Sequence, residues 1–237
     1  MDENQKLYER YRTAGFSDTG WAAVVEGYSQ LVDLLPSNHA VPLLDFGCGG
    51  GEFLEFARDL GFLEASGIDR SPEQVDRCRA RGLPAVELVN DPLAWLGGHR
   101  RCFGAVVMND VLEHIPKDSV VATLEAVREA LVPGGVLVVK VPNAANAFGL
   151  VARYLDFTHE VAFTEHSLHQ VLVIAGFSNI AVQGLAVKWR PTIRRSLYWA
   201  ANGLYRFGHA LVYRAAVGTD APRVLTKLLV VRAEAPL

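Results

Sequence analysis

The stretch PLLDFGCGGGEFLEF, residues 42–56, constrains the fold more than any other part of the chain. It places a cluster of glycines between a short apolar run and an amphipathic run, and the acid Asp45 stands just ahead of the cluster. Glycine adds no side chain to a core and loses much conformational freedom on folding, so such a cluster needs a local reason. A tight strand-to-helix turn, with a ligand lying against bare backbone, supplies that reason.

Short apolar runs alternate with amphipathic runs from Val41 onward. The runs at 43–46, 104–108 and 136–141 are largely apolar, and such runs are typical of strands covered on both faces. Between them, Ser71 and Pro72 favour a helix start and Gly82 favours its end. The alternation predicts an α/β fold with a parallel sheet. Further helices are expected across 21–35 and after Thr164, the latter ending at Gly176.

A second acid, Asp69, closes the next predicted strand about twenty residues after the glycines, where a carboxylate can accept both hydroxyls of a ribose. The fingerprint of NAD or FAD folds is G-x-G-x-x-G, whereas this loop reads D-x-G-x-G-x-G. An acid ahead of the glycines suits a cationic ligand better than a phosphate. A dinucleotide fold therefore stays as an alternative, as does a loop that merely turns sharply.

Composition bounds the class of protein. With 237 residues, 50% of them hydrophobic, the chain can build one sizeable core, and a net charge of -3 gives no overall attraction to nucleic acid. The charged first residues contain no secretion signal, so we expect a cytoplasmic protein. We expect an N-terminal helical cap over 1–40 and one ligand-binding domain over 41–237.

Four motifs follow one another in the order LLDFGCGGG, GIDRS, NDPLAWL, and VVMNDVLEHIP with LVPGGVLVVKVPN. Over about residues 41–180 they resemble class I S-adenosylmethionine-dependent methyltransferases, in particular the ubiquinone-biosynthesis-like O-methyltransferase group. The resemblance implies a Rossmann-like three-layer α/β/α sandwich whose mostly parallel seven-stranded sheet has an antiparallel last strand. It also implies that S-adenosylmethionine is bound by Asp45, Gly47, Cys48, Gly49, Asp69, Arg70, Asp91, Pro92, Leu93, Asn109, Asp110 and Val111.

Methyl transfer to oxygen needs an aligned nucleophile and a group that removes its proton. His114, with Glu113 before it, falls just beyond the fourth predicted strand, at the edge where open α/β sheets bind ligands. His159 lies in a second candidate segment, a lid over 144–166 that also holds Asp156 and Glu160. We take His114 and His159 as the catalytic candidates, although each could instead hold the loops together.

The segment 156–164, D-x-x-H-x-x-x-F-T, is similar to methyltransferases that act on sugars and polysaccharide precursors. The expected reaction is therefore O-methylation of a small molecule or a sugar or glycan precursor. An N-methyltransferase, a nucleotide-binding oxidoreductase or a non-catalytic cofactor-binding protein are the alternatives. The histidines are dispersed in the sequence and no acid pair has magnesium-site spacing, so metal-free chemistry is expected.

A basic, aromatic helical insertion is expected over 190–218, inside a stretch from His166 to Thr219 without any acid. Such an amphipathic helix could pack on the domain, rest on an anionic inner-membrane surface, guide a phosphorylated or lipid-linked acceptor, or join two copies into a homodimer. Nucleic acid is a weak alternative. The aromatic residues Tyr8, Tyr11 and Trp21 of the N-terminal segment are expected to cap the pocket, with Tyr11 near the cofactor.

Overall fold

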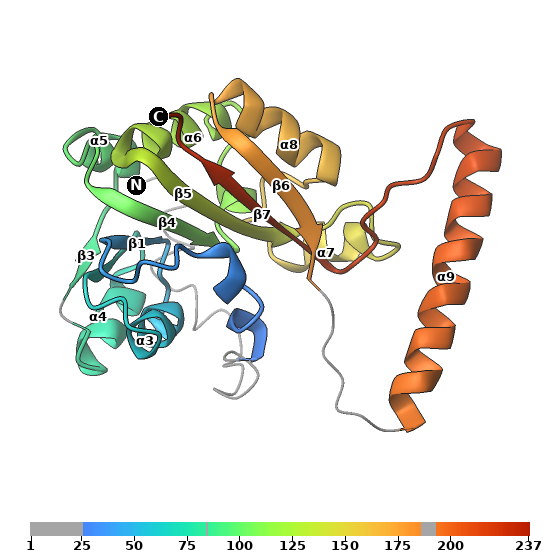
Figure 1. Cartoon of the computed structure of the whole chain (residues 1–237), viewed down its shortest axis with the longest axis horizontal. Helices are drawn as coiled ribbons and strands as arrows, with labels where there is room; N and C mark the ends of the chain where they lie inside the picture. The colour runs from blue at the N-terminus through green and yellow to red at the C-terminus, as the bar shows by residue number, and fades with distance from the viewer. Residues whose placement is uncertain (1–25, 84, 186–192) are drawn as a thin grey trace.

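The computed structural model describes residues 26–83, 85–185 and 193–237 (Figure 1). Seven strands form one sheet: β1 (Leu43–Phe46), β2 (Ala65–Asp69), β3 (Val86–Leu88), β4 (Phe103–Asn109), β5 (Leu131–Pro142), β6 (Ser178–Gly184) and β7 (Leu228–Glu234). Their order is β3-β2-β1-β4-β5-β7-β6. The first five strands pair in parallel, whereas β7 runs antiparallel to both β5 and β6. The expected sheet with an antiparallel last strand is confirmed.

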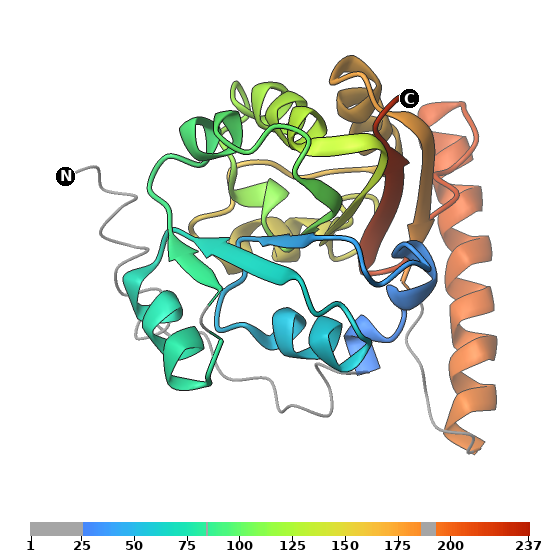
Figure 2. The same ribbon diagram turned by 60° about the vertical axis from the view of Figure 1, so that its left-hand side comes forward.

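Helices cover both faces of this sheet (Figure 2). On β5, Val136 and Val138 face one apolar cluster, and Leu137 and Val139 face the other. Because both faces are covered, the central strands are apolar along most of their length, and the three-layer sandwich is confirmed. The helices are the 3₁₀ turns η1 (Val32–Leu34) and η2 (Leu112–His114), with α3 (Glu52–Asp59), α4 (Pro72–Ala80), α5 (Pro92–Gly97), α6 (Val120–Ala130), α7 (Gly149–Leu155), α8 (Glu165–Ile174) and α9 (Ile193–Val217).

The strand order positions the site. β1 lies between β2 and β4. From β1 the chain builds β2 and β3 on one side of it, then crosses over to build β4 and β5 on the other side. The carboxyl ends of these three strands, at Phe46, Asp69 and Asn109, meet at one edge of the sheet. Open α/β sheets bind ligands at such a switch point.

A helix was expected across 21–35, and of this range the structure describes residues 26–35, which do not form one continuous helix. Residues 26–28 are helical, and the chain then turns into η1. Leu31 is fully buried against the sheet, and Tyr28 packs edge-on against Phe53 with ring centroids 5.2 Å apart. Packing on the core therefore overrides the helical pattern. Tyr8, Tyr11 and Trp21 lie outside the described residues, so their role stays a prediction.

The segment predicted as a lid, 144–166, contains α7 and is anchored at both ends. Asn143 bridges to Phe163, and its Nδ2 donates hydrogen bonds of 2.9 Å to the carbonyls of Val224 and Thr226. The ends of the segment are thereby held against the sheet, while α7 between them exposes apolar side chains.

The basic segment forms the long helix α9, which stands apart from the sheet in Figure 1. Among described contacts, the backbone N–H of Ala147 donates to the Tyr205 hydroxyl at 3.1 Å, and Arg206 donates to the carbonyl of Arg223 at 3.4 Å. Within the described ranges, no helix has the length and apolar character needed to cross a membrane.

Candidate cofactor and acceptor site

The glycine loop after β1 is tied to its neighbours through backbone. The N–H groups of Gly47 and Cys48 both donate to the carbonyl of Ile68, at 2.8 and 3.0 Å. Gly47 has a φ of +76°, and a Cβ atom there would lie 2.5 Å from Cγ2 of Val111. Only glycine combines this backbone conformation with so close an approach. The loop therefore packs directly against the segment that follows β4.

Asp69, at the end of β2, is bonded to that same loop. Its Oδ2 accepts a hydrogen bond from the N–H of Gly49 at 2.8 Å, and its Oδ1 accepts one from Ser71 at 2.8 Å. Burial raises the pKa of Asp69, and these two N–H donors oppose the shift. Each carboxylate oxygen keeps a further lone pair, so Asp69 is oriented and can still accept ribose hydroxyls.

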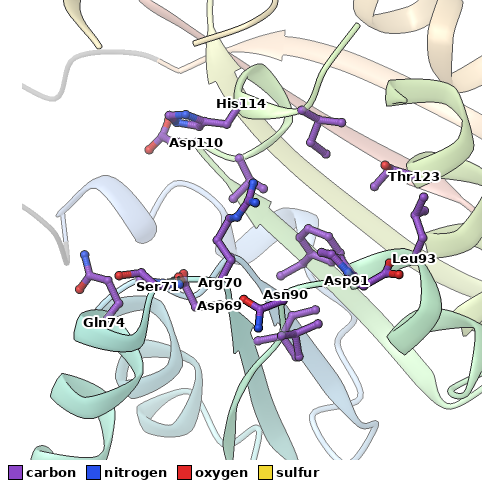
Figure 3. A pocket seen from close by; sticks show the side chains of 18 of the residues that line it. Asp69, Arg70, Ser71, Gln74, Asn90, Asp91, Leu93, Asp110, His114 and Thr123 are labelled. Carbon is purple, nitrogen blue, oxygen red and sulfur yellow. Dashed lines mark hydrogen bonds between the residues drawn. The ribbon is translucent and has the colours of Figure 1, made fainter. Parts of the chain in front are cut away.

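A cavity of about 600 Å³ opens at this edge of the sheet (Figure 3), within the range of about 300–1,000 Å³ common for small-molecule sites. Its lining includes most of the predicted cofactor residues and one catalytic candidate: Gly47, Gly49, Asp69, Arg70, Asp91, Pro92, Leu93, Asn109, Asp110, Val111 and His114. Asp45, Cys48 and His159 do not line it. Ten lining residues were not among the predicted site residues: Phe46, Ile68, Ser71, Asn90, Ile115 and Pro116, which lie inside the motifs, and Gln74, Val89, Ser119 and Thr123, which lie outside them.

Asp45 lies beneath the loop. Its side chain is 1% exposed, and neither carboxylate oxygen has a hydrogen-bond partner in the described part of the chain. Burial, followed by the nearby Asp69 carboxylate, raises the pKa of Asp45 well above its usual value, while Lys140 lowers it. Such an acceptor suits a ligand that brings donors or positive charge, although Asp45 does not line the cavity.

Cys48 is also buried, and its surroundings are those of a packing residue. It belongs to a small apolar cluster with Cys78 and Leu83, and the Cys78 thiol donates to the carbonyl of Gly49 at 3.1 Å. The hydrogen bond with Cys78, followed by burial, raises the pKa of the Cys48 thiol. The residue supports the loop from below.

Asp91 lines the far end of the cavity and also begins α5. Its Oδ1 accepts a hydrogen bond from the N–H of Ala94 at 3.0 Å, which satisfies one free donor of the helix start. Asn90, the preceding residue, also lines the cavity. This end of the cavity thus combines one polar helix start with the apolar Leu93 and Val89.

Lys140 is a charged neighbour that the motifs did not reveal. It pairs with Asn109 across β4 and β5, and its Nζ lies 2.7 Å from Oδ2 of Asp110. It also lies over the ring of Tyr28, 5.5 Å from the centroid. Because it lowers the pKa of both Asp45 and Glu113, this ammonium offsets the negative charge around the carboxyl ends of β1 and β4.

The fold brings the two catalytic candidates together. The rings of His114 and His159 are 4.7 Å apart between centroids and meet edge-on. The carbonyl of Glu113 accepts hydrogen bonds from Glu160 at 2.7 Å and from Val161 at 3.0 Å. These bonds fix the predicted lid against η2. Burial, followed by the neighbouring His159, lowers the pKa of His114 to about 4.

The sequence predicted no metal-ligand set, but the fold brings three residues with potential ligand atoms together at this point. Glu113, His114 and His159 each offer a ligand atom, and these atoms all lie within 4.8 Å of one another. The histidines are dispersed in sequence, but the 156–161 loop folds back onto η2 and brings them into contact. Spacing along the chain could not reveal this cluster.

These residues fit S-adenosylmethionine. A Cβ at Gly49 would meet nothing within 4 Å, so bare backbone faces open space next to the oriented Asp69 carboxylate. The fold and the site together define a methyltransferase that uses S-adenosylmethionine as methyl donor. A family model described as a methyltransferase domain matches residues 21–182, well over half of the chain, which therefore belongs to this family (Methyltransf_23).

Solved structures share the fold. A SAM-dependent methyltransferase from Archaeoglobus fulgidus superposes with a TM-score of 0.68 at 18% identity, covering 98% of this chain and 100% of that one. An S-adenosylmethionine-dependent methyltransferase from Mesorhizobium loti has a TM-score of 0.61 at 21% identity, covering 91% and 100%. Phosphoethanolamine N-methyltransferase 2 from Haemonchus contortus gives 0.61 at 16%, covering 100% and 58%. No curated protein matches the chain.

Proposed function

We propose that this methyltransferase acts on an oxygen, in a small molecule or a sugar or glycan precursor. The observation that carries the proposal is the meeting of His114 and His159 at the end of the cavity beyond Asp110. When bound, the cofactor supplies an electrophilic methyl group. Asp69 would hold its ribose, and the Asn109–Val111 segment would face its sulfonium end. The histidine pair would then act on the proton of the acceptor hydroxyl.

The motifs resemble the ubiquinone-biosynthesis-like O-methyltransferase group, and this resemblance supports oxygen as the acceptor atom. The phosphoethanolamine N-methyltransferase shows that a similar fold also serves nitrogen acceptors, so N-methylation is the alternative to exclude. A screen with labelled S-adenosylmethionine would compare hydroxyl acceptors, including sugars and phenols, with primary and secondary amines. Methyl transfer to amines alone would overturn the proposal.

Substitution of the histidines tests their role. His114→Ala and His159→Ala should each lower turnover on a hydroxyl acceptor by about 100-fold or more, with little change in cofactor affinity. His169→Ala, on an exposed position of α8, is the control. Unchanged turnover in both variants would leave the pair without a part in the reaction.

We further propose that α9 holds the enzyme on an anionic membrane surface, so that the acceptor is lipid-linked. Four apolar side chains of α9 at helical spacing are exposed by 62–73%: Leu197, Leu204, Phe207 and Leu211. No acid occurs between His166 and Thr219, whereas Arg206 and Arg214 lie on this helix. An apolar face on a helix whose charged side chains are arginines matches an anionic bilayer better than it matches water, although Arg214 also pairs with Asp220 just beyond the helix, at 3.6 Å.

The predicted lid adds exposed apolar surface close to the acceptor end. Phe148, Leu150, Leu155 and Phe157, in and beside α7, are exposed by 72–89%. His159 is held to this helix, because its Nδ1 lies 2.9 Å from the carbonyl of Ala152. A lipid chain could therefore lie along α7 while its head group reaches the histidines. This arrangement supports a lipid-linked sugar as the acceptor class.

A further inference from the structure

Glu113, His114 and His159 bring three potential metal-ligand atoms together, and direct proton abstraction by the histidines does not explain the presence of Glu113 among them. We infer that these three side chains form a binding site for one divalent transition-metal ion, such as Zn²⁺, which holds the acceptor oxygen. The inference rests on the proposed O-methyl transfer and deepens it. The first observation is proximity, since one potential ligand atom of each residue lies within 4.8 Å of the others.

Hydrogen bonding sets the tautomer of His114. The Thr158 hydroxyl donates its proton to Oδ1 of Asp156 at 2.7 Å, so its oxygen accepts from His114 Nδ1, which lies 2.8 Å away. The Asp156 side chain is held in turn by the N–H of Thr158 at 2.8 Å. With the proton on Nδ1, the lone pair of His114 is on Nε2. Carboxylate-supported imidazoles of this kind are the common form of metal-ligating histidine.

His159 has the same tautomer for an independent reason. Its Nδ1 lies 2.9 Å from the carbonyl oxygen of Ala152, and a carbonyl can only accept a hydrogen bond. Nδ1 therefore carries the proton and Nε2 carries the lone pair. Two imidazoles from distant parts of the chain thus meet edge-on, each fixed as an acceptor at Nε2.

Glu113 supplies the third ligand. Its side chain is 2% exposed, and neither carboxylate oxygen has a hydrogen-bond partner within the described ranges. A buried carboxylate without donors is costly unless a cation compensates it. The nearby charges are the carboxylates of Asp110 and Asp156 and the ammonium of Lys140, which is engaged 2.7 Å from Asp110. Counting Glu113 itself, three carboxylates and one ammonium therefore surround the position where the ion would lie.

The ligand set selects the ion. Two imidazole nitrogens and one carboxylate suit Zn²⁺ and similar first-row ions, whereas Mg²⁺ and Ca²⁺ prefer oxygen ligands throughout. Bonds of about 2.0–2.2 Å would draw the three side chains closer together. Three protein ligands leave a position open for an exogenous oxygen, which is the pattern of catalytic rather than structural sites.

The ion would lower the pKa of an acceptor hydroxyl bound at the open position. The O–H bond then breaks and its proton passes to solvent water. The oxygen lone pair forms the new O–CH₃ bond as the S–CH₃ bond breaks, and that electron pair stays on sulfur. The sulfonium thereby becomes a neutral thioether. The imidazoles act on the acceptor proton through the ion that they hold, which acidifies the hydroxyl, and do not accept the proton themselves.

Zn²⁺ binding to the chelator-stripped full chain tests the inference by calorimetry and elemental analysis. We expect one ion per chain, with affinity reduced by about 100-fold or more in Glu113→Gln and His159→Ala. Thr158→Val should bind Zn²⁺ about 10–100-fold more weakly, because His114 is no longer oriented by the Thr158 hydroxyl. His169→Ala should bind Zn²⁺ as the wild type does. Far-UV circular dichroism of each variant checks that it is folded.

A wild-type chain that takes up no ion would overturn the inference, as would Glu113→Gln and His159→Ala variants that bind Zn²⁺ as tightly as the control. Cofactor binding is measured on the same stripped protein. If the protein binds no Zn²⁺ but still methylates hydroxyl acceptors, the metal site is refuted and the proposed function stands. A Zn²⁺ site in an enzyme that methylates only amines removes the proposed O-methylation instead.

Discussion

The carboxylate of Asp69 accepts a hydrogen bond from the backbone N–H of Gly49 at 2.8 Å. The bond joins the two motifs predicted to bind the cofactor, the glycine loop after β1 and the acid that ends β2. Since Ser71 holds the other oxygen at 2.8 Å, the carboxylate is oriented before any ligand arrives. The site is preorganised by backbone, so its residues can be tested one by one.

Asp69→Ala should weaken S-adenosylmethionine binding by about 1–3 kcal/mol, because charge-assisted hydrogen bonds to the ribose are lost. Calorimetric titration measures the change. Asp59→Ala, at an exposed position at the end of α3, is the matched control and should bind as the wild type does. Equal affinities in all three proteins would remove Asp69 from the site.

Gly47→Ala should destabilise the fold by about 1–2 kcal/mol or more, because its φ of +76° is unfavourable for alanine and the new Cβ would lie 2.5 Å from Val111. Urea unfolding gives the free energy. At Gly97, which ends α5, a Cβ would meet nothing within 4 Å, so Gly97→Ala should be neutral or mildly stabilising. A Gly47→Ala variant as stable as this control would contradict the described loop.

Asp45→Asn should change the pH dependence of stability. Because the folded-state pKa of Asp45 is raised, the folded chain keeps a proton that the unfolded chain releases above the reference pKa of 3.8. This costs about 1.4 kcal/mol of stability for each unit by which the folded pKa exceeds the unfolded one, and the loss develops as pH rises. Urea unfolding is measured between about pH 4 and pH 7, a range that lies above the unfolded pKa. The free energy of unfolding of Asp45→Asn should increase relative to that of the wild type as the pH rises.

A constant difference across that range would contradict a raised pKa at Asp45. The same variant should bind S-adenosylmethionine more weakly if this acid serves the positive end of the cofactor, which separates a stability effect from a binding effect.

Leu204→Glu with Phe207→Glu should abolish flotation of the enzyme with anionic vesicles, because the two charges interrupt the exposed face of α9. The wild type should float with anionic but not with neutral vesicles, and less so at high salt. Leu63→Glu, at a side chain that is 83% exposed away from α9, is the control. If the wild type does not float with any vesicle, but forms a dimer that the double variant disrupts, then α9 is a dimer contact and not a membrane contact.

More of the fold than of the proposed acceptor end of the site could be predicted from the sequence. Strands β1, β4 and β5 could be predicted because burial on both faces leaves them apolar, and Ser71, Thr164 and Gly176 mark helix ends as expected. The antiparallel last strand came from family resemblance, since periodicity carries no strand direction.

What could not be predicted depends on contacts between distant segments. Lys140 is a single charge inside an apolar strand, and only the β4–β5 register places it beside Asp110. His114 and Thr158 are 44 residues apart, so their hydrogen bond and the cluster around it arise only when the lid docks on η2. The motifs predicted to bind the cofactor are local in sequence, whereas the proposed acceptor end is assembled by tertiary structure.

Every role proposed for this enzyme depends on the glycine loop and Asp69 binding S-adenosylmethionine. Calorimetric titration of the purified full chain with S-adenosylmethionine and, separately, with NADH measures this binding. We predict micromolar binding of S-adenosylmethionine at one molecule per chain and no heat from NADH. Binding of NADH without binding of S-adenosylmethionine would contradict the account.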